Sequence, residues 1–387
     1  MFAAGAVQAL VSILLWTIDL GGRYAALWAA PSWPLPSSWL HALLMQYGIF
    51  PYFIFGFILT AGPRWQGASD LIGRDFVQPF IVLSAGWAIF YAGLLWPRLL
   101  PFALFTVLIG WLGVLRLLWR IERVKWADRR HIRAIAVAIL CGFFGLACAT
   151  LMIVDPNGEW ARGMILFGIW GFLLPVFFSV AHRMIPFFSS AQIPNYRLYS
   201  PYWALWGVLA ASMAHGVLES LALTQTTWVV DIPAAVIVFA LSWRWRLRQS
   251  LVSSLLAVLH ISFVWLGIAF ALFAVRSLSE LVGFYALGLA PLHALTIGYF
   301  ASTAVGMVSR VTRGHSGLVL MGDRPMIVAF CCMQLAAVAR VGSEFVALPG
   351  PWNLAFVASL MWLTAFGVWA VRYMPAYWRP RADGRPG

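Results

Sequence analysis

The stretch PLHALTIGYFASTAVGMVSRVTRGHSG, residues 291–317, decides the fold of this chain. Its composition predicts an apolar helix that crosses a membrane and carries one histidine, His293, near its middle. The basic segment that follows holds Arg310, Arg313 and His315. A histidine at that depth is energetically costly, so it indicates a functional site. Neutral imidazole is also the commonest metal ligand in proteins.

The composition of the whole chain agrees with a membrane protein. Hydrophobic residues make up 62% of the 387 positions and charged residues only 10%, and there are 22 tryptophans. One soluble core cannot bury that much apolar surface. The net charge of +13 does not indicate nucleic-acid binding, because the basic residues are not gathered in a soluble domain or an aromatic-lined groove. We expect the lipid bilayer to be a partner of the protein, and we expect no nucleic-acid partner.

Crossing a bilayer as a helix takes about 20 apolar residues. By that measure we expect a single all-α domain, residues 1–387, built as a polytopic bundle of about twelve transmembrane helices. The predicted spans are residues 3–20, 37–61, 74–96, 99–119, 132–154, 161–181, 200–224, 227–243, 252–274, 283–308, 325–343 and 351–371.

The basic residues predict the orientation of this bundle. With both termini in the cytoplasm, 21 of the 26 basic residues lie on the inner side, and seven of them fall between Arg116 and Arg133. This asymmetry follows the positive-inside rule and favours a multi-pass protein of the bacterial cytoplasmic (inner) membrane. The outer side holds five: Arg23, Arg98, Arg162, Arg276 and Arg340.

Four histidines, His41, His215, His260 and His293, fall inside predicted spans. At 1.5 Å per residue, His215 and His293 are expected about 13–15 Å below the outer surface, with His260 somewhat deeper and His41 nearer the outside. Two axial ligands of one iron stand about 4 Å apart, because metal–nitrogen distances are about 2 Å. We therefore expect His293 to share an iron with His215 or His260. The alternative for any one position is a hydrogen bond to a neighbouring helix, and we expect His131 to be solvated.

Two inner helix ends predict a second site. His182 and Arg183 end one span, and Arg310, Arg313 and His315 follow another. If these spans are neighbours, the guanidinium groups would suit carboxylates such as haem propionates, with both histidines as further metal ligands. Ordinary positive-inside charge in contact with lipid headgroups is the alternative.

Other features argue for or against particular classes. We expect no carboxylate near the middle of a span, although a proton-coupled carrier usually needs one, and no His-His pair of the kind that haem–copper oxidases carry is present.

Residues 40–43, LHAL, recur at 292–295, which indicates either chance or a structural repeat. No cysteine lies in a zinc or c-type haem motif, and we expect all four to be buried as small apolar groups: Cys141, Cys148, Cys331 and Cys332.

Several blocks resemble one protein family. Residues 293–298, HALTIG, followed by GMVSR at 306–310 and GHSG at 314–317, are similar to the signature of the NnrS family. The block HRMIPFF at 182–188 and the span 39–65, with its GFILTA run and PRW ending, resemble the same family. The resemblance identifies the chain as a divergent member of these bacterial membrane proteins of the nitric oxide response.

The resemblance implies a twelve-span protein that binds haem, of the b type, and copper. It also implies nitric oxide or a related small molecule as ligand, a role in protection from nitrosative stress, and quinol or a cytochrome as a candidate electron donor. One family pattern is incomplete. Members tend to read W-H-x-H-E-M in the second span, and His41 and Met45 match, but Leu43 and Leu44 replace the second histidine and the glutamate.

Three functions stay open at this stage. The first is a haem protein, with or without copper, that contributes to nitric oxide tolerance by binding, scavenging or electron transfer, with His293 and one or two of His215, His260 and His41 on the iron. The second is a twelve-span solute permease without a redox cofactor. The third is a membrane enzyme that reduces nitric oxide or oxidises quinol, which needs an open coordination position.

Overall fold

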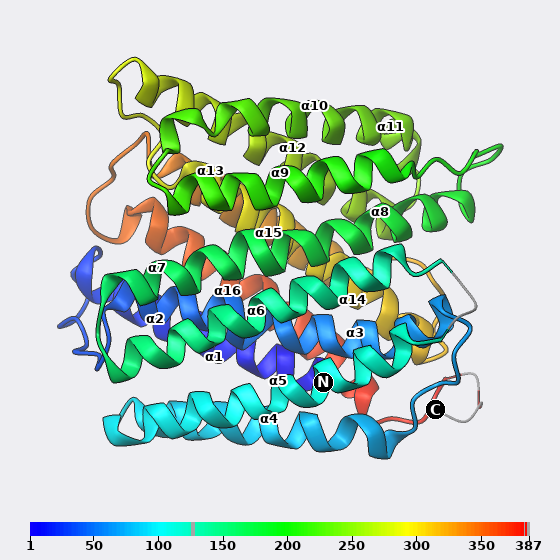
Figure 1. The fold of residues 1–387 in the computed structure, drawn as a ribbon, viewed down its shortest axis with the longest axis horizontal. Coiled ribbons are helices and arrows are strands. Elements are labelled where there is room, and N and C mark those ends of the chain that lie inside the picture. Colours follow the sequence, from blue (N-terminus) through cyan, green and yellow to red (C-terminus); the bar gives the residue numbers. More distant parts are fainter. Residues whose placement is uncertain (125–127, 383, 385–387) are drawn as a thin grey trace. The chain divides into compact units, whose positions relative to one another are not determined.

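The structure, a computed structural model, describes residues 1–124, 128–382 and 384, and every regular element in that part of the chain is a helix (Figure 1). This confirms the all-α prediction. Lys125 and Arg385, two residues of the predicted inner charge, lie outside the described residues. The first half contains α1 Phe2–Arg23, α2 Ser37–Leu43, η1 Leu44–Ile49, α3 Phe50–Trp65, α4 Gly73–Gly93, η2 Pro97–Leu99, α5 Leu100–Glu122, α6 Arg130–Val154, α7 Gly158–Leu166, η3 Phe167–Leu173 and α8 Leu174–Ser190. The second half contains α9 Tyr202–Ser220, η4 Thr224–Thr226, α10 Trp228–Arg244, α11 Leu247–Ser250, α12 Ser254–Leu281, α13 Ala290–His293, η5 Ala294–Ala301, α14 Ser302–His315, α15 Arg324–Gly342, η6 Gly350–Trp352, α16 Leu354–Tyr373 and η7 Met374–Tyr377.

A helix lies at each of the twelve predicted spans. Among the described residues, ten helical segments are long and apolar enough to cross a membrane. The remaining two predicted spans correspond to α9, with 19 residues, and α10, with 17. The protein is therefore a polytopic all-α membrane protein, and the count of twelve stays a prediction.

The chain forms two compact units. Unit 1 contains residues 1–12 and 32–179, and unit 2 contains residues 13–31 and 180–387. Small residues bring neighbouring helices close together within unit 1. A side chain at Gly86 of α4 would meet Val107 of α5 at 2.6 Å, and one at Gly110 would meet Leu83 at 2.6 Å. Such close backbone approach is how membrane helices associate without a hydrophobic driving force.

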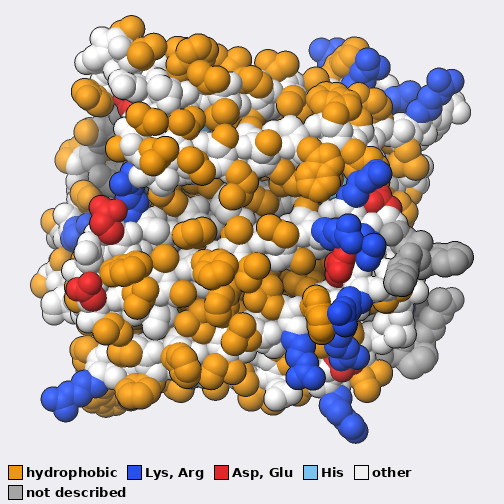
Figure 2. All heavy atoms as spheres, viewed as in Figure 1, with side chains coloured by type: hydrophobic (Ala, Val, Ile, Leu, Met, Phe, Trp, Pro, Cys, Tyr) orange, Lys and Arg blue, Asp and Glu red, His pale blue; other side chains and the backbone are white. Residues whose placement is uncertain are grey.

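The surface matches this assignment. In Figure 2, hydrophobic side chains cover the lengths of the helices, while arginine side chains stand at helix ends. Val137 and Phe144 of α6, for example, are exposed apolar side chains, and their contact with water would be unfavourable. A lipid environment suits such a face, since helices satisfy their own backbone hydrogen bonds.

Three segments of the described chain are π-helical. The π-helical segments η1, η3 and η5 each interrupt one long span, and those three spans are the most buried of the ten. Both LHAL stretches lie where an α-helix passes into a π-helix, at the start of η1 and of η5. The sequence match therefore corresponds to a shared local structure. Short π-helical segments are frequent at functional sites.

Candidate functional site

His293 is the last residue of α13 and lies directly before η5. Its Nδ1 donates to the Leu289 carbonyl over 2.9 Å, since a carbonyl can only accept. The proton is thereby fixed on Nδ1, so Nε2 carries the lone pair, as in histidines whose other nitrogen is held by a second hydrogen bond in metal sites. The side chain is half-buried.

The depth predicted for His293 is wrong. The span begins at Ala290, seven residues later than predicted, because Gly283, Leu287 and Gly288 have positive φ angles that end regular structure there. His293 is therefore the fourth residue of its helix, about 5 Å along it, and lies near one end rather than the middle.

The π-helical segment η5 is supported by a chain of side-chain hydrogen bonds. The hydroxyl of Ser302 donates to the Ile297 carbonyl at 3.1 Å, five residues back. Gln334 of α15 donates to that hydroxyl at 2.7 Å and accepts from the indole of Trp265 of α12 at 2.8 Å. Trp265 also packs where Gly298 has no side chain, since a Cβ there would lie 2.5 Å away. We call Trp265, Gln334 and Ser302 the η5 relay.

His215 lies in a network of charged side chains. Its Nδ1 is 2.6 Å from Asp231 Oδ1 and its Nε2 is 3.5 Å from Glu219 Oε1. Arg276 donates to the same Glu219 oxygen at 2.9 Å. His215 and Asp231 are both fully buried. We call His215, Glu219, Asp231 and Arg276 the outer network, since they lie toward the predicted outer side. Asp231 is the hydrogen-bond partner of Nδ1, and Glu219 is the carboxylate nearest to Nε2.

Asp231 is the residue that the sequence interpretation missed. It is an aspartate inside the predicted span 227–243, four residues from its start, and the structure buries it completely. A lone carboxylate inside an apolar span was the available signal, since such groups almost always pair with another ionisable side chain.

Packing between α12 and the run from α13 to α14 fixes their relative heights. A Cβ at Gly306 would lie 2.8 Å from Val258, and one at Gly298 would lie 2.5 Å from Trp265. The two helices thus run antiparallel, so residues at the same height have higher numbers in one helix where they have lower numbers in the other. By this register His293 is level with about residue 270 of α12.

The register decides which histidines can share an iron. His260 lies about ten residues from the level of His293, or about 15 Å along α12, so the predicted pairing of His293 with His260 is wrong. His215 packs edge-to-face on Phe273 with ring centroids 4.8 Å apart. It is therefore at nearly the height of His293, as predicted.

A second group of side chains surrounds the end of α8. The guanidinium of Arg310 lies over the ring of Phe188, 3.9 Å from its centroid. The neighbouring Ser189 hydroxyl lies 3.0 Å from His260 Nε2 and donates its proton to the Ile185 carbonyl. His260 Nε2 therefore donates to Ser189, and its Nδ1 carries the lone pair. We call Phe188, Ser189, His260 and Arg310 the inner cluster.

Arg310 lacks an acceptor in the inner cluster. Its side chain is only 6% exposed, and within the described residues its Nη1 has no hydrogen-bond partner. Stacking on an aromatic ring offsets part of the cost of burying a cation, but it supplies no hydrogen-bond acceptor. The two helix ends that were predicted to be neighbours are in contact through Phe188 and Arg310.

His182 lies deeper in its helix than predicted. The predicted span ends at residue 181, but α8 continues to Ser190, which places His182 about 12 Å from the helix end. It is fully buried, and its Nε2 donates to the Pro201 carbonyl at 3.1 Å. The neighbouring Arg183 is half-buried. The proline inside the helix, Pro186, does not end it.

Arg313 binds a carboxylate of the chain itself. Its Nη1 donates to Asp323 at 2.9 Å and its Nε to the Val319 carbonyl at 2.8 Å. Asp323 also accepts from Arg372 at 2.7 Å and from Tyr373 at 2.9 Å. Arg313, which was predicted to bind a ligand carboxylate such as a haem propionate, therefore binds a carboxylate of the chain itself. His315 ends α14 as an exposed residue.

Burial of Asp323 alone would raise its pKa, but the hydrogen bonds from Tyr373, Arg372 and the Met326 amide outweigh that effect and lower it. This carboxylate is therefore held in its ionised form. Because Arg313 and Arg372 share it, the region keeps a net positive charge.

In unit 1, His41 lies in the last turn of α2, just before η1, and is half-buried. Leu43 and Leu44, which replace the family's histidine and glutamate, are 0% and 1% exposed. Nearby, the Tyr47 hydroxyl donates to the Met164 carbonyl at 2.8 Å. These leucines fill the position of the missing ligands with apolar packing, so the family's ligand set is not completed here.

Some predicted sites and environments are not found. Within the described residues, no three or more His, Cys, Asp or Glu side chains gather as a metal site built from three such protein ligands would require. His131 was expected to be solvated but is buried, 4% exposed at the start of α6. Cys331 was expected to be buried but is exposed, while Cys141, Cys148 and Cys332 are half-buried. An exposed thiol on a membrane helix can face lipid as readily as a small apolar group.

Within the described residues, the protein has ten long apolar helices, three of them with π-helical segments. Ionisable side chains are buried at two heights in unit 2. These features define an integral membrane protein with internal polar sites. The chain matches the NnrS protein family over residues 1–381, and it belongs to that family. Membership indicates a membrane protein of the nitric oxide response. Comparison with curated proteins gave no match.

Proposed function

We propose that the protein binds haem b in unit 2 and contributes to nitric oxide tolerance in the bacterial inner membrane. The observation that carries this proposal is Arg310, a buried guanidinium whose Nη1 has no acceptor within the described residues. A buried charge left without a partner is strongly unfavourable. A ligand that brings a carboxylate to this position would remove that cost.

Haem fits the inner cluster because it combines carboxylates with an iron that imidazole binds. Guanidinium groups recognise carboxylates through two parallel hydrogen bonds. His260 is level with about residue 304 of α14, so it lies about 9 Å along the helix from Arg310. That separation is on the scale of the distance between a haem iron and its propionates. His293 lies too far along the same helix to serve a haem whose propionate binds Arg310.

The residues of the inner cluster would have separate tasks. Ser189 holds the proton on His260 Nε2, which leaves Nδ1 as the ligand nitrogen. Arg310 would bind the propionate, and Phe188 fixes the plane of that guanidinium. When bound, haem would supply an iron that can take nitric oxide. The family resemblance adds copper, for which His293, with its lone pair on Nε2, is the candidate ligand, since imidazole suits copper.

The test is an optical spectrum of the purified protein, oxidised, reduced and reduced with nitric oxide, together with iron and copper analysis. We expect a haem spectrum that nitric oxide perturbs. His260→Ala should lose the haem, His293→Ala should keep it and lose copper, and His315→Ala, an exposed control, should keep both.

Other outcomes decide between the remaining functions. A protein that folds, is supplied with haem and binds neither iron nor copper would contradict the proposal and favour the solute permease. A haem spectrum that nitric oxide leaves unchanged would favour electron transfer from quinol or a cytochrome. Haem lost in His293→Ala but kept in His260→Ala would place the haem at the height of His293 and not at the inner cluster.

A further inference from the structure

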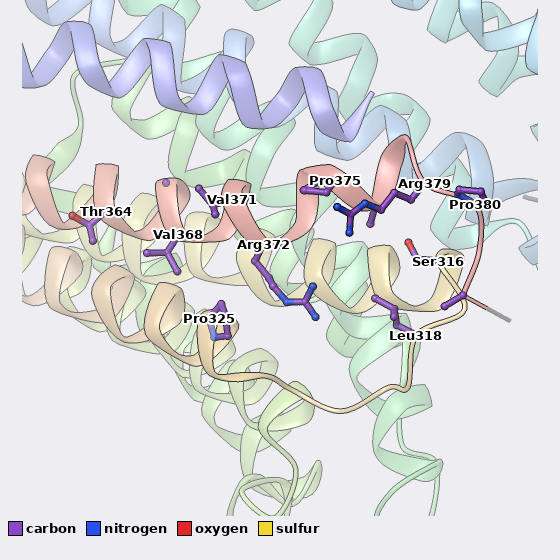
Figure 3. A pocket seen from close by; sticks show the side chains of 13 residues that line it. Ser316, Leu318, Pro325, Thr364, Val368, Val371, Arg372, Pro375, Arg379 and Pro380 are labelled. Carbon is purple, nitrogen blue, oxygen red and sulfur yellow. The ribbon is translucent and has the colours of Figure 1, made fainter.

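A groove lies at the end of α16. It has a volume of about 850 Å³ and is formed by α16 and η7, by Pro325 at the start of α15, and by Ser316 and Leu318 just after α14. Figure 3 shows Thr364, Val368, Val371 and Arg372 following one another along α16, with Pro325, Ser316 and Leu318 facing them. All of these residues belong to unit 2.

One end of the groove is positively charged. Arg372 and Arg379 line it, and no acidic residue does among the described residues. Arg372 donates to Asp323 through Nε only, so in the described part of the chain its two Nη groups have no hydrogen-bond partner. Asp323 is already shared with Arg313. Arg379 is exposed, and no described carboxylate pairs with it.

The other end of the groove is apolar and follows a membrane helix. Thr364, Val368 and Val371 recur at helical spacing on one face of α16, which is one of the ten candidate spans. Val371 is 82% exposed. A Cβ at Gly367 would meet nothing within 4 Å, so the missing side chain widens the groove.

The dimensions match one leaflet of a bilayer. From Thr364 to Arg372 the groove wall runs about 12 Å along the helix, and the hydrocarbon of one leaflet is about 15 Å thick. The apolar wall would therefore lie beside an acyl chain while the two arginines stand at headgroup level. Basic residues at that level attract anionic lipids.

We propose that this groove binds one anionic phospholipid, with its phosphate at Arg372 and Arg379 and one acyl chain along the Thr364–Val371 face of α16. The arginines select the headgroup charge, and the apolar wall distinguishes a lipid from a free phosphate ion. The lipid would hold the ends of α14, α15 and α16 together at the membrane surface. The site is independent of the inner cluster and of haem.

The experiment is native mass spectrometry of the detergent-purified full chain, titrated with phosphatidylglycerol and with phosphatidylcholine of identical acyl chains. We expect phosphatidylglycerol to bind about fivefold more tightly or better. Arg379→Gln should remove about fivefold of that preference. Arg248→Gln, which changes an exposed arginine of α11 in the same unit, should leave it unchanged.

A second variant tests the acyl chain. Gly367→Leu fills open space in the groove, so we expect it to fold and to weaken both lipids by the same factor. Equal binding of the two lipids by the unmodified chain would overturn the proposal, as would an Arg248→Gln effect equal to that of Arg379→Gln. Displacement of phosphatidylglycerol by inorganic phosphate, with no effect of Gly367→Leu, would assign the arginines to a free anion instead.

Discussion

The outer network and the inner cluster both bury ionisable side chains in unit 2, but they balance charge differently. In the outer network, His215 faces two carboxylates and Arg276 binds one of them. In the inner cluster, Arg310 has an aromatic ring beneath it and no acceptor for Nη1 in the described residues. Removing one partner of a buried charged pair is strongly destabilising, whereas a buried charge that lacks a partner indicates a ligand.

The largest effect is expected where a paired charge loses its partner. Asp231→Ala would leave His215 buried without its closest acceptor. We expect the free energy of unfolding to fall by about 3 kcal/mol. The measurement is thermal unfolding of the purified protein, with Asp231→Asn as the control that keeps a hydrogen-bond acceptor. An unchanged melting temperature in Asp231→Ala would contradict the structural role of the paired charges in the outer network.

The second prediction concerns the unpaired charge. Arg310→Met keeps the length of the side chain and removes the buried cation. We expect the haem-free protein to unfold at the same temperature or a higher one, because a buried charge without a partner is replaced by apolar packing of similar volume. The same thermal measurement checks this. A loss of stability as large as that of Asp231→Ala would mean that Arg310 is structural.

A smaller effect is expected in the η5 relay. Gln334→Leu removes the hydrogen bonds to Trp265 and to Ser302 that support the π-helical segment. Side-chain hydrogen bonds between membrane helices contribute about 0.6 kcal/mol each on average, so we expect a loss of about 1 kcal/mol in unfolding free energy. Gln192→Leu, at a position outside the relay, is the control. Equal stabilities for the two variants would show that η5 does not depend on the relay.

The smallest effect concerns pH. The pKa of Asp323 is lowered in the folded protein below its ordinary value, so its contribution to the free energy of unfolding is present above the unfolded pKa and is lost as pH falls through the folded pKa. We expect no change in its contribution between pH 7 and about 5, and a loss below about 4. Melting curves of the unmodified chain and of Asp323→Asn should differ at pH 6 and lie closer together at pH 3. Curves that stay equally far apart at both would contradict the assignment.

The fold was largely predictable because apolar length sets it. Every predicted span contains a helix, since an apolar run of about 20 residues has few other structures in a bilayer. The ends were less predictable. The start at Ala290 depends on the positive φ angles before it, and the extension of α8 to Ser190 depends on packing that tolerates Pro186.

The site was predictable in composition but not in pairing. The blocks that contain Phe188 and Arg310 do meet, because α8 and α14 are neighbours. The pairing of His293 with His260 failed because helix register, which Gly298 and Gly306 set, is not contained in a count of residues from a helix end. LHAL precedes η1 and overlaps the start of η5, but η3 begins without it, so the sequence offers no signature common to all three π-helical segments.

The central claim is that the inner cluster holds a carboxylate-bearing haem. The direct measurement is a titration of haem into the haem-free protein, followed by its Soret absorbance, for the unmodified chain and for Arg310→Met. We predict saturation at one equivalent for the unmodified chain. For the variant we predict a haem affinity at least about tenfold lower, since a charge-assisted hydrogen bond contributes about 1.5–3 kcal/mol. Equal affinity in two equally stable proteins would contradict the account.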